Sequence, residues 1–381
     1  MTELHITNSI RSSMSRPTLV LSGVGMKEGG ILSVMRHVME AAERTLPPDW
    51  RIIGLVHRKE LVPTLRAELL EFPDIKASWL KRMYFEWFTS RRLARELGAT
   101  VWFSLHDITS LVDVPRQFVY CHNPACFTRP TLRSLYFDWV FFAHALMYGL
   151  LYSLNIRRNE QVFVQQSWIR DAFIKRFGAR EVTVARPSSP THARRARDIN
   201  GPLRRWIYPT FPRHFKNIEV IGDALLILEK NESWTGEVQV TIKGDESRYA
   251  HYLKRRFGHL RSLKFVGRQS ASQMADLYAN ADGLLFPSRL ETWGLPITEA
   301  QAIGLPMLIA DLKYAHETVG SYEGVSFFDP TDARELAKLL LALSTAETKL
   351  GSAVASDQLG VPTEVGWDAL IRNCCAQRQA T

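Results

Sequence analysis

Cysteine is scarce in this chain, and the few cysteines do not follow the spacing of a metal or redox site. The 381 residues include four: Cys121, Cys126, Cys374 and Cys375. Their spacing is neither that of a zinc ribbon nor that of a C-x-x-C motif, and they make no disulfide framework at this length. We therefore expect buried or incidental thiols in a reducing compartment.

The chain also lacks a signal-peptide core, because residues 1–16 are polar and rich in serine. This segment is predicted to be a flexible tail. One apolar run, Trp139 to Asn155, approaches the ~17-residue lower limit for a membrane span. Because it contains His144 and Gly149 and is bordered by charged residues, a buried or interface helix is favoured over a span.

Low-complexity, collagen-like and wholly disordered classes are excluded by a composition that is 46% hydrophobic and 23% charged. The formal net charge of +9 is unevenly distributed. Residues 1–200 hold 28 basic and 18 acidic residues, whereas residues 201–381 hold 20 and 21. The first half is therefore expected to face something anionic. No helix-turn-helix, zinc or RNA-binding signature accompanies the charge, so nucleic acid is not the expected partner.

Short apolar runs typical of buried parallel strands alternate with amphipathic helical segments. A segment rich in Pro, Ser and Arg, 186–202, interrupts the alternation and is predicted to be a linker. Repeated βα units imply right-handed crossovers and parallel sheets. The sequence therefore predicts an α/β protein of two doubly wound domains facing a cleft, at 17–187 and 203–360. The expected strands are Thr18–Ser22, Arg51–Val56, Thr100–Phe103, Gln117–Cys121, Gln161–Val164, Val182–Ala185, Trp206–Tyr208, Glu237–Ile242, Leu263–Val266, Gly283–Phe286, Pro306–Ile309 and Val325–Phe328.

The segment 286–311 holds the strongest candidate site. Glu291 lies in a loop after a predicted strand, and Glu299 lies eight positions on, in a helix that begins near Pro296. Gly294 between them allows close backbone approach to a ligand, and the helix start favours an anion such as phosphate. Carboxylates beside such a site could accept hydrogen bonds from sugar hydroxyls. A capped surface helix with two acidic residues explains the same pattern equally well.

The wider pattern resembles glycosyltransferase family 4. The resemblance rests on Glu291 and Glu299 in the E-x7-E spacing, with Gly294, Pro296 and G-L-P at 304–306. It continues in KFVGRQS (264–270), MADLYANADGLLFPS (274–288) and FFDPTDARELAKLL (327–340), and covers most of 204–344. It implies the two-domain GT-B fold and retaining transfer of a sugar from a nucleotide-sugar donor.

Site roles follow from this resemblance. Glu299 is expected to bind the ribose hydroxyls of the donor, and Glu291 to contact hydroxyls of the donor sugar and orient it. The segment Val266–Arg268, with Arg268, is expected to frame the nucleobase. The backbone around four consecutive residues is expected to bind the diphosphate or the sugar: Thr292, Trp293, Gly294 and Leu295.

The segment FPRHFKN (211–217) resembles the family motif whose cations neutralise the departing diphosphate. Lys216 and Asn217 match the end of that motif, but Phe211 stands where the arginine is usual, and Arg213 is the candidate substitute. Lysine and arginine can stabilise a developing diphosphate without a metal. The sequence has no D-x-D motif, so we expect neither a metal nor another cofactor. A solvated lysine at a helix start is the alternative for Lys216.

The first domain contributes a glycine-rich loop and two histidine segments. The glycines of SGVGMKEGG do not fit G-x-G-x-x-G, yet the loop resembles the first βα loop of GT-B enzymes, in which Gly29 or Gly30 lies near the donor phosphate or the acceptor. His122, at the end of a predicted strand, resembles a family histidine that contacts the donor sugar or acceptor. A second pair, His106 and Asp107, is a candidate for the acceptor side. A tight turn and a structural histidine are the alternatives.

The resemblance implies a saccharide or lipid-linked saccharide acceptor, as in bacterial surface polysaccharide or lipopolysaccharide synthesis. Basic residues in 157–198 beside the apolar run suit attachment to an anionic membrane surface from the cytoplasm. A nucleotide-sugar epimerase, a phosphorylase and an inactive binding module on the same fold are the alternatives. A last helix, 363–377, is expected to return to the first domain. No residue suggests a covalent nucleophile, and the resemblance implies a front-face reaction rather than double displacement.

Overall fold

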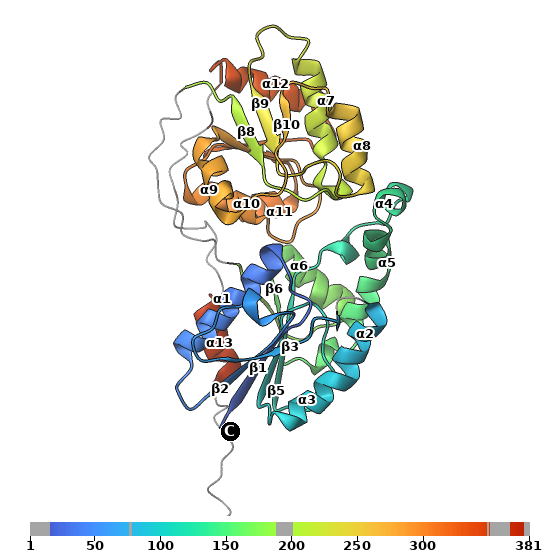
Figure 1. Ribbon diagram of the computed structural model, residues 1–381, viewed down its shortest axis with the longest axis vertical. Helices are drawn as coiled ribbons and strands as arrows, with labels where there is room; N and C mark the ends of the chain where they lie inside the picture. The colour runs from blue at the N-terminus through green and yellow to red at the C-terminus, as the bar shows by residue number, and fades with distance from the viewer. Residues whose placement is uncertain (1–15, 76–77, 188–200, 349, 351–365, 377–381) are drawn as a thin grey trace, which may run out of the picture. The chain divides into compact units, whose positions relative to one another are not determined.

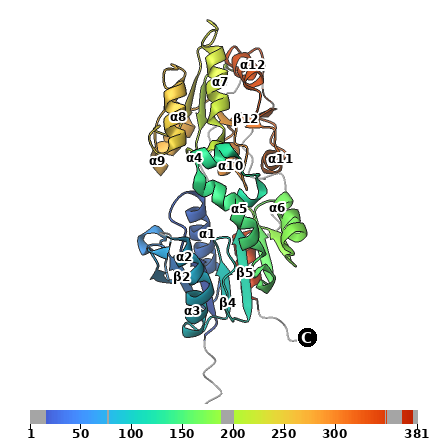
Figure 2. The same ribbon diagram turned by 90° about the vertical axis from the view of Figure 1, so that its right-hand side faces the viewer.

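The computed structural model describes residues 16–75, 78–187, 201–348, 350 and 366–376. The chain forms two compact units, and neither is continuous in sequence (Figure 1). The first unit comprises residues 1–122, 150–186 and 364–381, and the second comprises residues 123–149 and 187–363. Each unit has a parallel sheet covered by helices, which can be followed in Figures 1 and 2.

The first unit has a seven-stranded sheet in the order β3-β2-β1-β4-β5-β6-β7. Every neighbouring pair is parallel, and the strand order reverses direction at β1 and β4. The strands are β1 (Thr18–Gly23), β2 (Arg51–Val56), β3 (Glu68–Glu71), β4 (Val101–Ser104), β5 (Arg116–Cys121), β6 (Gln161–Val164) and β7 (Val182–Val184).

Alternate residues of β1 enter the cores on opposite faces of this sheet. Leu19 and Leu21 pack with α1 (Gly29–Thr45) and α13 (Trp367–Cys375), whereas Val20 packs with α3 (Ser90–Glu96) and the neighbouring turn. Both sets are completely buried, as the period-2 geometry of a central parallel strand requires.

The second unit has a six-stranded parallel sheet in the order β10-β9-β8-β11-β12-β13, which reverses direction at β8 and β11. Right-handed crossovers place α7 and α8 on one face and α9, α10 and α11 on the other (Figure 1). The strands are β8 (Arg205–Tyr208), β9 (Glu237–Val240), β10 (Leu263–Phe265), β11 (Gly283–Phe286), β12 (Met307–Ala310) and β13 (Val325–Phe328). The helices are α7 (Ile218–Leu228), α8 (Arg248–Phe257), α9 (Ala271–Asn280), α10 (Leu295–Ala302), α11 (Lys313–Val319) and α12 (Ala333–Ser344).

The predicted fold class is confirmed, and all twelve expected strands are present. One strand was missed, because β3 reads Glu-Leu-Leu-Glu and lies at the edge of its sheet with exposed ends. The helical stretch Trp79–Glu96 is interrupted. It divides into α2 (Trp79–Tyr84), a π-helical turn (Phe85–Thr89) that buries Glu86, and α3. The four cysteines are buried thiols, as predicted.

Parts of several expected segments lie outside the described residues: 1–15 of the tail, 188–200 of the linker, 349 and 351–360 of the second domain, and 363–365 and 377 of the last helix. The described part of that helix, α13, packs on α1 within the first unit, where Arg44 forms an ion pair with Asp368.

Residues 123–149 leave the first sheet and belong to the second unit. They contain α4 (Leu132–Phe137) and most of α5 (Trp139–Ser153). The ring of Phe137 lies 5.4 Å from that of Tyr249 and 5.1 Å from that of Tyr252, and Arg133 pairs with Glu219. Among the described residues, the helical stretch Trp139–Arg158 is the one that is long and apolar enough to span a membrane, with 28% of it buried.

Gly222 in α7 provides a test of the packing in the second unit. A Cβ at this position would lie 2.6 Å from ring carbons of Phe257 on α8. Alanine favours helix by about 1 kcal/mol over glycine, but crowding the fully buried Phe257 costs about 1–3 kcal/mol. We expect Gly222→Ala to lower the urea midpoint of unfolding. Gly201→Ala is the matched control, because nothing lies within 4 Å of its Cβ position; equal midpoints for the two variants would contradict the packing.

Candidate active site

The second sheet changes direction between β8 and β11, and ligands of doubly wound folds bind at the carboxyl ends of strands at such a point. Trp206 pairs with Gly283 and Ile207 with Leu284, so the two strands end side by side. The loops that follow them, 209–217 and 287–294, carry most of the predicted donor residues. Parallel pairing thus brings together motifs that lie about 75 positions apart in the chain.

Lys216 and Glu291 meet at this edge. The ammonium group of Lys216 donates to Oε1 of Glu291 at 2.5 Å, and both side chains are largely buried, with 16% and 14% exposed. Lys216 ends a 3-10 turn, His214–Lys216, that precedes α7. A cation and a carboxylate held beside each other can engage an anionic group and a hydroxyl donor, respectively.

Asn217 fixes the position of Lys216. Its backbone is left-handed, with φ of 56°, a conformation that asparagine adopts more readily than most residues. Its buried amide nitrogen donates to the carbonyls of Pro287 at 3.2 Å and Pro330 at 2.8 Å. The hydroxyl of Tyr208 donates to the carbonyl of Lys216 at 2.9 Å. The loops after β8, β11 and β13 are therefore joined through one side chain.

Two side chains of α11 donate hydrogen bonds to the loop 288–295. Tyr314 donates to the carbonyl of Ser288, and Thr318 donates to that of Trp293, each at 2.6 Å. Gly294, with φ of 88°, immediately precedes α10. These contacts direct the positive end of the α10 dipole and its first-turn amides toward the loop. Thr292 and Leu295 are half-buried, and Trp293 is buried.

Glu299 lies on α10 and is oriented by α9. The hydroxyl of Tyr278 donates to Oε2 of Glu299 at 2.6 Å. Burial and the neighbouring Glu299 raise the pKa of Tyr278 well above its ordinary value, so its hydroxyl remains a proton donor. One carboxylate oxygen of Glu299 is thereby fixed in place. Tyr278 was not identified from the sequence, although it lies within the motif 274–288.

The contact that Arg213 makes in the structure is not the one predicted for it. Its guanidinium forms an ion pair with Asp138, which immediately precedes α5. Arg289, which the sequence analysis missed, lies two positions before Glu291. Its backbone donates to the carbonyl of Phe215 at 2.8 Å, and its guanidinium donates to that of Pro330 at 3.3 Å. Arg268 is exposed after β10.

In the first unit, the loop after β1 leads into α1. Gly29, with φ of 68°, is the first residue of α1, and Gly30 beside it is exposed. At Gly25 in the same loop, a Cβ would lie 2.4 Å from Nη1 of Arg82. The glycine loop therefore packs closely against an arginine from α2.

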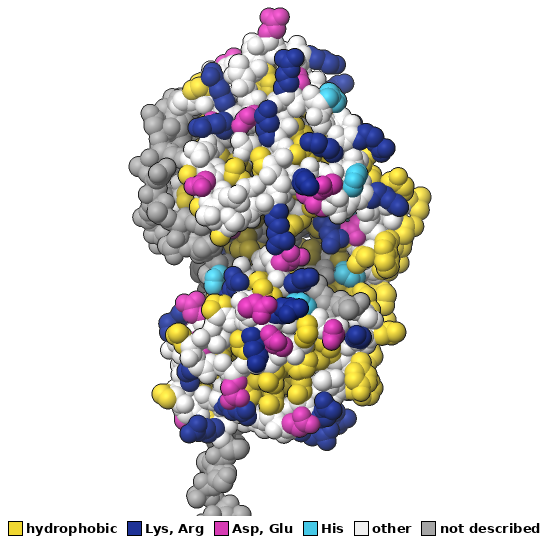
Figure 3. Space-filling model, in the orientation of Figure 1, with side chains coloured by type: hydrophobic (Ala, Val, Ile, Leu, Met, Phe, Trp, Pro, Cys, Tyr) yellow, Lys and Arg dark blue, Asp and Glu magenta, His cyan; other side chains and the backbone are white. Residues whose placement is uncertain are grey.

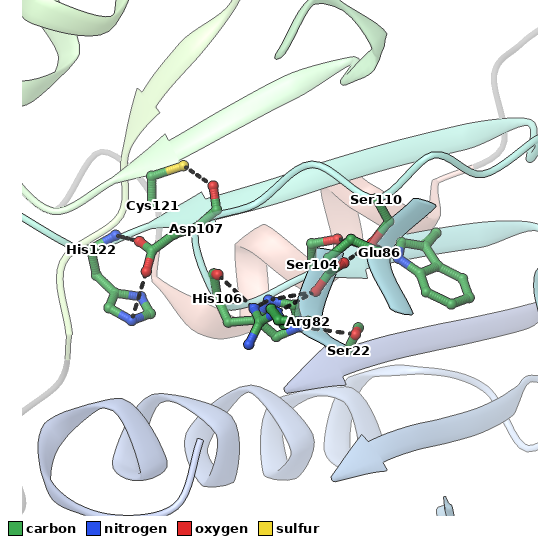
Figure 4. A network of polar contacts seen from close by, with 10 residues as sticks. Ser22, Arg82, Glu86, Ser104, His106, Asp107, Ser110, Cys121 and His122 are labelled. Carbon is green, nitrogen blue, oxygen red and sulfur yellow. Dashed lines mark hydrogen bonds and ion pairs between the residues drawn. The ribbon is translucent and has the colours of Figure 1, made fainter. Parts of the chain in front are cut away.

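His106 lies inside a buried polar network (Figure 4). Its Nε2 is 3.1 Å from the hydroxyl of Ser22 at the end of β1, and its Nδ1 contacts the guanidinium of Arg82. Arg82 also donates to Glu86 at 2.8 Å, and Ser110 donates to Glu86 at 2.6 Å. Both ring nitrogens of His106 are thus engaged within the protein. Arg82 and Glu86 were not predicted from the sequence, although an acidic residue on an otherwise apolar helix face is a recognisable signal.

Burial dominates the electrostatics of this network. Burial, and then the charge of Arg82, lower the pKa of His106 well below its ordinary value, so the imidazole is neutral at physiological pH. Burial raises the pKa of Glu86 against the opposing effects of Arg82 and Ser110. The network therefore holds the loop after β1 against the loop after β4 without a charged histidine.

Asp107 and His122 meet at the carboxyl ends of β4 and β5. Oδ1 of Asp107 accepts a hydrogen bond from the backbone of His122 at 2.7 Å and another from the hydroxyl of Tyr152 at 3.0 Å. Nε2 of His122 lies 3.7 Å from Oδ2 of Asp107 (Figure 4). Asp107 has a left-handed backbone, with φ of 76°. Its carboxylate therefore orients the imidazole that was predicted to contact substrate.

The fold and the site together define a class of protein. Such a protein has two doubly wound α/β units, and a candidate site for an anion and a hydroxyl group lies where the strand order of the second sheet reverses. Part of the chain matches a known family. Residues 206–353, all in the second unit, match the family described as Glycosyl transferases group 1. The curated D-inositol 3-phosphate glycosyltransferase of Rhodococcus erythropolis is 31% identical over 103 residues. That match covers 27% of this chain and 23% of the relative's length.

Solved structures resemble the whole chain. WaaG, described as a glycosyltransferase involved in lipopolysaccharide biosynthesis, has a TM-score of 0.62 at 15% identity, covering 86% of this chain and 93% of its own. HepE of Anabaena, solved in complex with UDP-glucose, has a TM-score of 0.57 at 16% identity, covering 93% and 98%. At these identities the likeness shows the fold, which is GT-B, as predicted.

The buried His106 predicts a pH dependence of stability. Because the pKa of His106 is depressed in the folded protein, the unfolded state takes up this proton first as the pH falls below about 6.5. Stability is therefore present above that pH and lost below it, by at most about 1.4 kcal/mol per pH unit. His106→Gln should flatten this slope between pH 7.5 and 5.5 in urea unfolding. Glu86 is present in both the wild type and the variant. Equal slopes of unfolding free energy against pH for the two proteins would therefore contradict a neutral buried His106.

The contact between Tyr278 and Glu299 predicts a change in donor affinity. Tyr278→Phe removes a hydrogen bond to a charged group, so we expect the KM for the donor to rise about 5–10-fold with a smaller change in kcat. Tyr322→Phe is the matched control, because its buried hydroxyl donates to the carbonyl of Leu305 at 3.0 Å, away from Glu299. A similar rise in KM for both variants would indicate a general loss of packing.

Proposed function

We propose that this protein is a retaining glycosyltransferase that moves a sugar from a nucleotide-sugar donor to a saccharide or lipid-linked saccharide acceptor. The observation that carries the proposal is the Lys216–Glu291 pair, which lies at the switch point of the second sheet beside the start of α10. The match of residues 206–353 to the group 1 glycosyltransferases supports the same activity. HepE, which is similar in fold, was solved with UDP-glucose, a donor of this class.

Each residue of the second unit has a role in this proposal. Lys216 stabilises the negative charge that develops on the leaving diphosphate, and Glu291 accepts hydrogen bonds from the donor sugar. Glu299, held by Tyr278, accepts hydrogen bonds from the ribose. The amides near Gly294 contact the diphosphate or the sugar. Arg289 is a second candidate cation, since Arg213 is paired with Asp138.

We favour a front-face reaction. The bond between the anomeric carbon and the leaving phosphate oxygen breaks, and the acceptor oxygen bonds to the same face of that carbon. The acceptor proton passes to the leaving phosphate oxygen. This route needs positioning and charge stabilisation rather than a covalent nucleophile. The proposal assigns charge stabilisation to Lys216, with Arg289 as a second candidate cation and the amides near Gly294, and it requires no metal.

The first unit is proposed to serve the acceptor. His122, oriented by Asp107, and the glycine loop at Gly29 lie at the carboxyl ends of their strands, where substrates bind in such sheets. The positive charge of residues 1–200 suits a cytoplasmic enzyme that works at the inner face of an anionic membrane. Similarity in fold to WaaG is consistent with a lipid-linked surface-saccharide acceptor.

The test is a screen of UDP, GDP, ADP and dTDP sugars for hydrolysis and transfer, with NMR of the anomeric configuration of the product. We expect turnover of one nucleotide class with retention. Lys216→Ala and Glu291→Gln should lower kcat by about 10²–10³-fold, as for loss of one charge-stabilising group. His122→Ala should lower transfer more than donor binding.

Arg51→Ala is the matched control, because it also breaks an ion pair, with Glu68 at 2.7 Å, but at an exposed position between β2 and the edge strand β3 of the first sheet. It should retain normal turnover. Wild-type rates in all three site variants would overturn the site assignment, and inversion of configuration would overturn the mechanism. Donor binding without hydrolysis or transfer to any acceptor would favour an inactive binding module.

A further inference from the structure

Large apolar side chains are exposed along α4 and the outer face of α5. Leu132 is 85% exposed, Trp139 69% and Leu150 63%, which are high values for side chains of this size. We call this region the α4–α5 apolar surface and define it by Leu132, Leu135, Tyr136, Trp139, Leu146, Met147 and Leu150. Figure 3 shows hydrophobic side chains gathered at the right-hand side, over the place of α4 and α5 in Figure 1.

The exposed stripe of α5 is distinct from the face that packs on the protein. Trp139, Leu146 and Leu150 recur at helical spacing on one side, whereas Phe141 and Tyr148 on the other side are buried. The ring of Phe141 lies 4.9 Å from that of Phe215. Farther along the helix, Tyr152 is buried and donates to Asp107. With its inner face packed in this way, α5 exposes its outer stripe.

A basic helix of the same unit lies beside α4. Arg248 of α8 donates to the carbonyl of Tyr136 at 3.0 Å, and its guanidinium lies 5.0 Å from the centre of the Tyr136 ring. Helix α8 also carries Lys254, Arg255 and Arg256 and contains no acidic residue. The apolar surface is therefore bordered by fixed positive charge.

A small cavity lies between these elements. Its volume is about 240 Å³, below the ~300–1,000 Å³ typical of pockets for drug-sized ligands, so it suits a headgroup rather than a nucleotide. It is lined by Tyr136, Phe137, Arg248, His251, Tyr252 and Arg255. Two nearby arginines are neutralised, since Arg256 pairs with Asp223 and Arg133 with Glu219. Among the described residues, no carboxylate pairs with Arg248 or Arg255.

We propose that the α4–α5 apolar surface and this arginine-lined cavity together form a docking site for the anionic leaflet of a phospholipid membrane. The guanidinium groups of Arg248 and Arg255 receive the lipid phosphate, and Leu132, Trp139 and Leu146 enter the acyl boundary. Charge complementarity selects this occupant, because an apolar protein partner would not require two unneutralised arginines at the edge. The inference rests on the proposed function in one respect, which is the lipid-linked acceptor that membrane docking would serve.

The site differs from the membrane region expected from sequence. That expectation combined the apolar run 139–155 with basic residues at 157–198, whereas the structure places the cations of α8 beside α4. Arg248 and Arg255 lie about 110 positions after the helix they border, so no local pattern linked them to it.

The experiment is flotation of the full chain with vesicles of phosphatidylcholine alone or with 30% phosphatidylglycerol, at low and high salt. We expect salt-sensitive binding to the anionic vesicles. Arg248→Ala/Arg255→Ala should weaken it about 30-fold, given the contribution of each basic residue at an anionic surface. Trp139→Ser/Leu146→Ser should weaken it while leaving the melting temperature unchanged, because both side chains are exposed.

The matched control is Arg334→Ala/Lys338→Ala on α12, which removes the same charge from exposed positions outside the surface. It should bind like the wild type. Equal weakening of the control and the α8 variant would overturn the proposal in favour of nonspecific charge attraction. Absence of wild-type binding would also overturn it. So would self-association abolished by Trp139→Ser/Leu146→Ser, which would assign the surface to a second copy of this chain.

Nucleotide-sugar binding is measured on the same samples. Normal donor binding in a protein that does not bind vesicles would overturn this inference and leave the proposed function intact. Vesicle binding without turnover of any donor would support the docking site and contradict the proposed function.

Discussion

The candidate donor site depends on the two hydrogen bonds that Asn217 donates to carbonyls of the loops after β11 and β13. Both contacts are buried, so their loss would leave unsatisfied carbonyls at a cost of about 1–3 kcal/mol each. The left-handed backbone of Asn217 turns the chain from the 3-10 turn into α7 and sets the position of Lys216. The carbonyl of Pro287 lies four positions before Glu291, so the same side chain aligns both partners of the ion pair. A parallel sheet brings the loops near each other, and Asn217 fixes their register.

The sequence alone predicted the features that repeat along the chain or that depend on local backbone preferences. Apolar runs such as Thr18–Ser22 predict buried parallel strands, and parallel strands place the loops of Lys216 and Glu291 at one edge. The sequence also predicted that Gly294 precedes a helix that begins near Pro296, because both residues have strong backbone preferences. The candidate site in the second unit therefore followed from local patterns combined with a topology rule.

Features that depend on pairing between distant polar groups could not be predicted. His106 was expected on the acceptor side, but burial against Ser22 and Arg82 makes it part of the packing of the first unit. Arg213 was expected near the diphosphate, but Asp138 engages it from a segment that the sequence assigned to the other half. No composition or period marks residues 123–149 as part of the second unit, because their contacts with α8 are specified by rings such as Phe137 and Tyr252.

The discontinuity of both units has a consequence for biosynthesis. The first unit includes α13, which carries Trp367 and Leu370 into its core, so that core is incomplete until nearly the whole chain has been translated. The second unit includes α4, which is synthesised before any strand of its own sheet. Neither unit can therefore finish folding as an independent amino-terminal domain on the ribosome. The nascent helices α4 and α5 are apolar on their outer faces. About a hundred more residues are synthesised after them before α8, which covers Phe137, is complete.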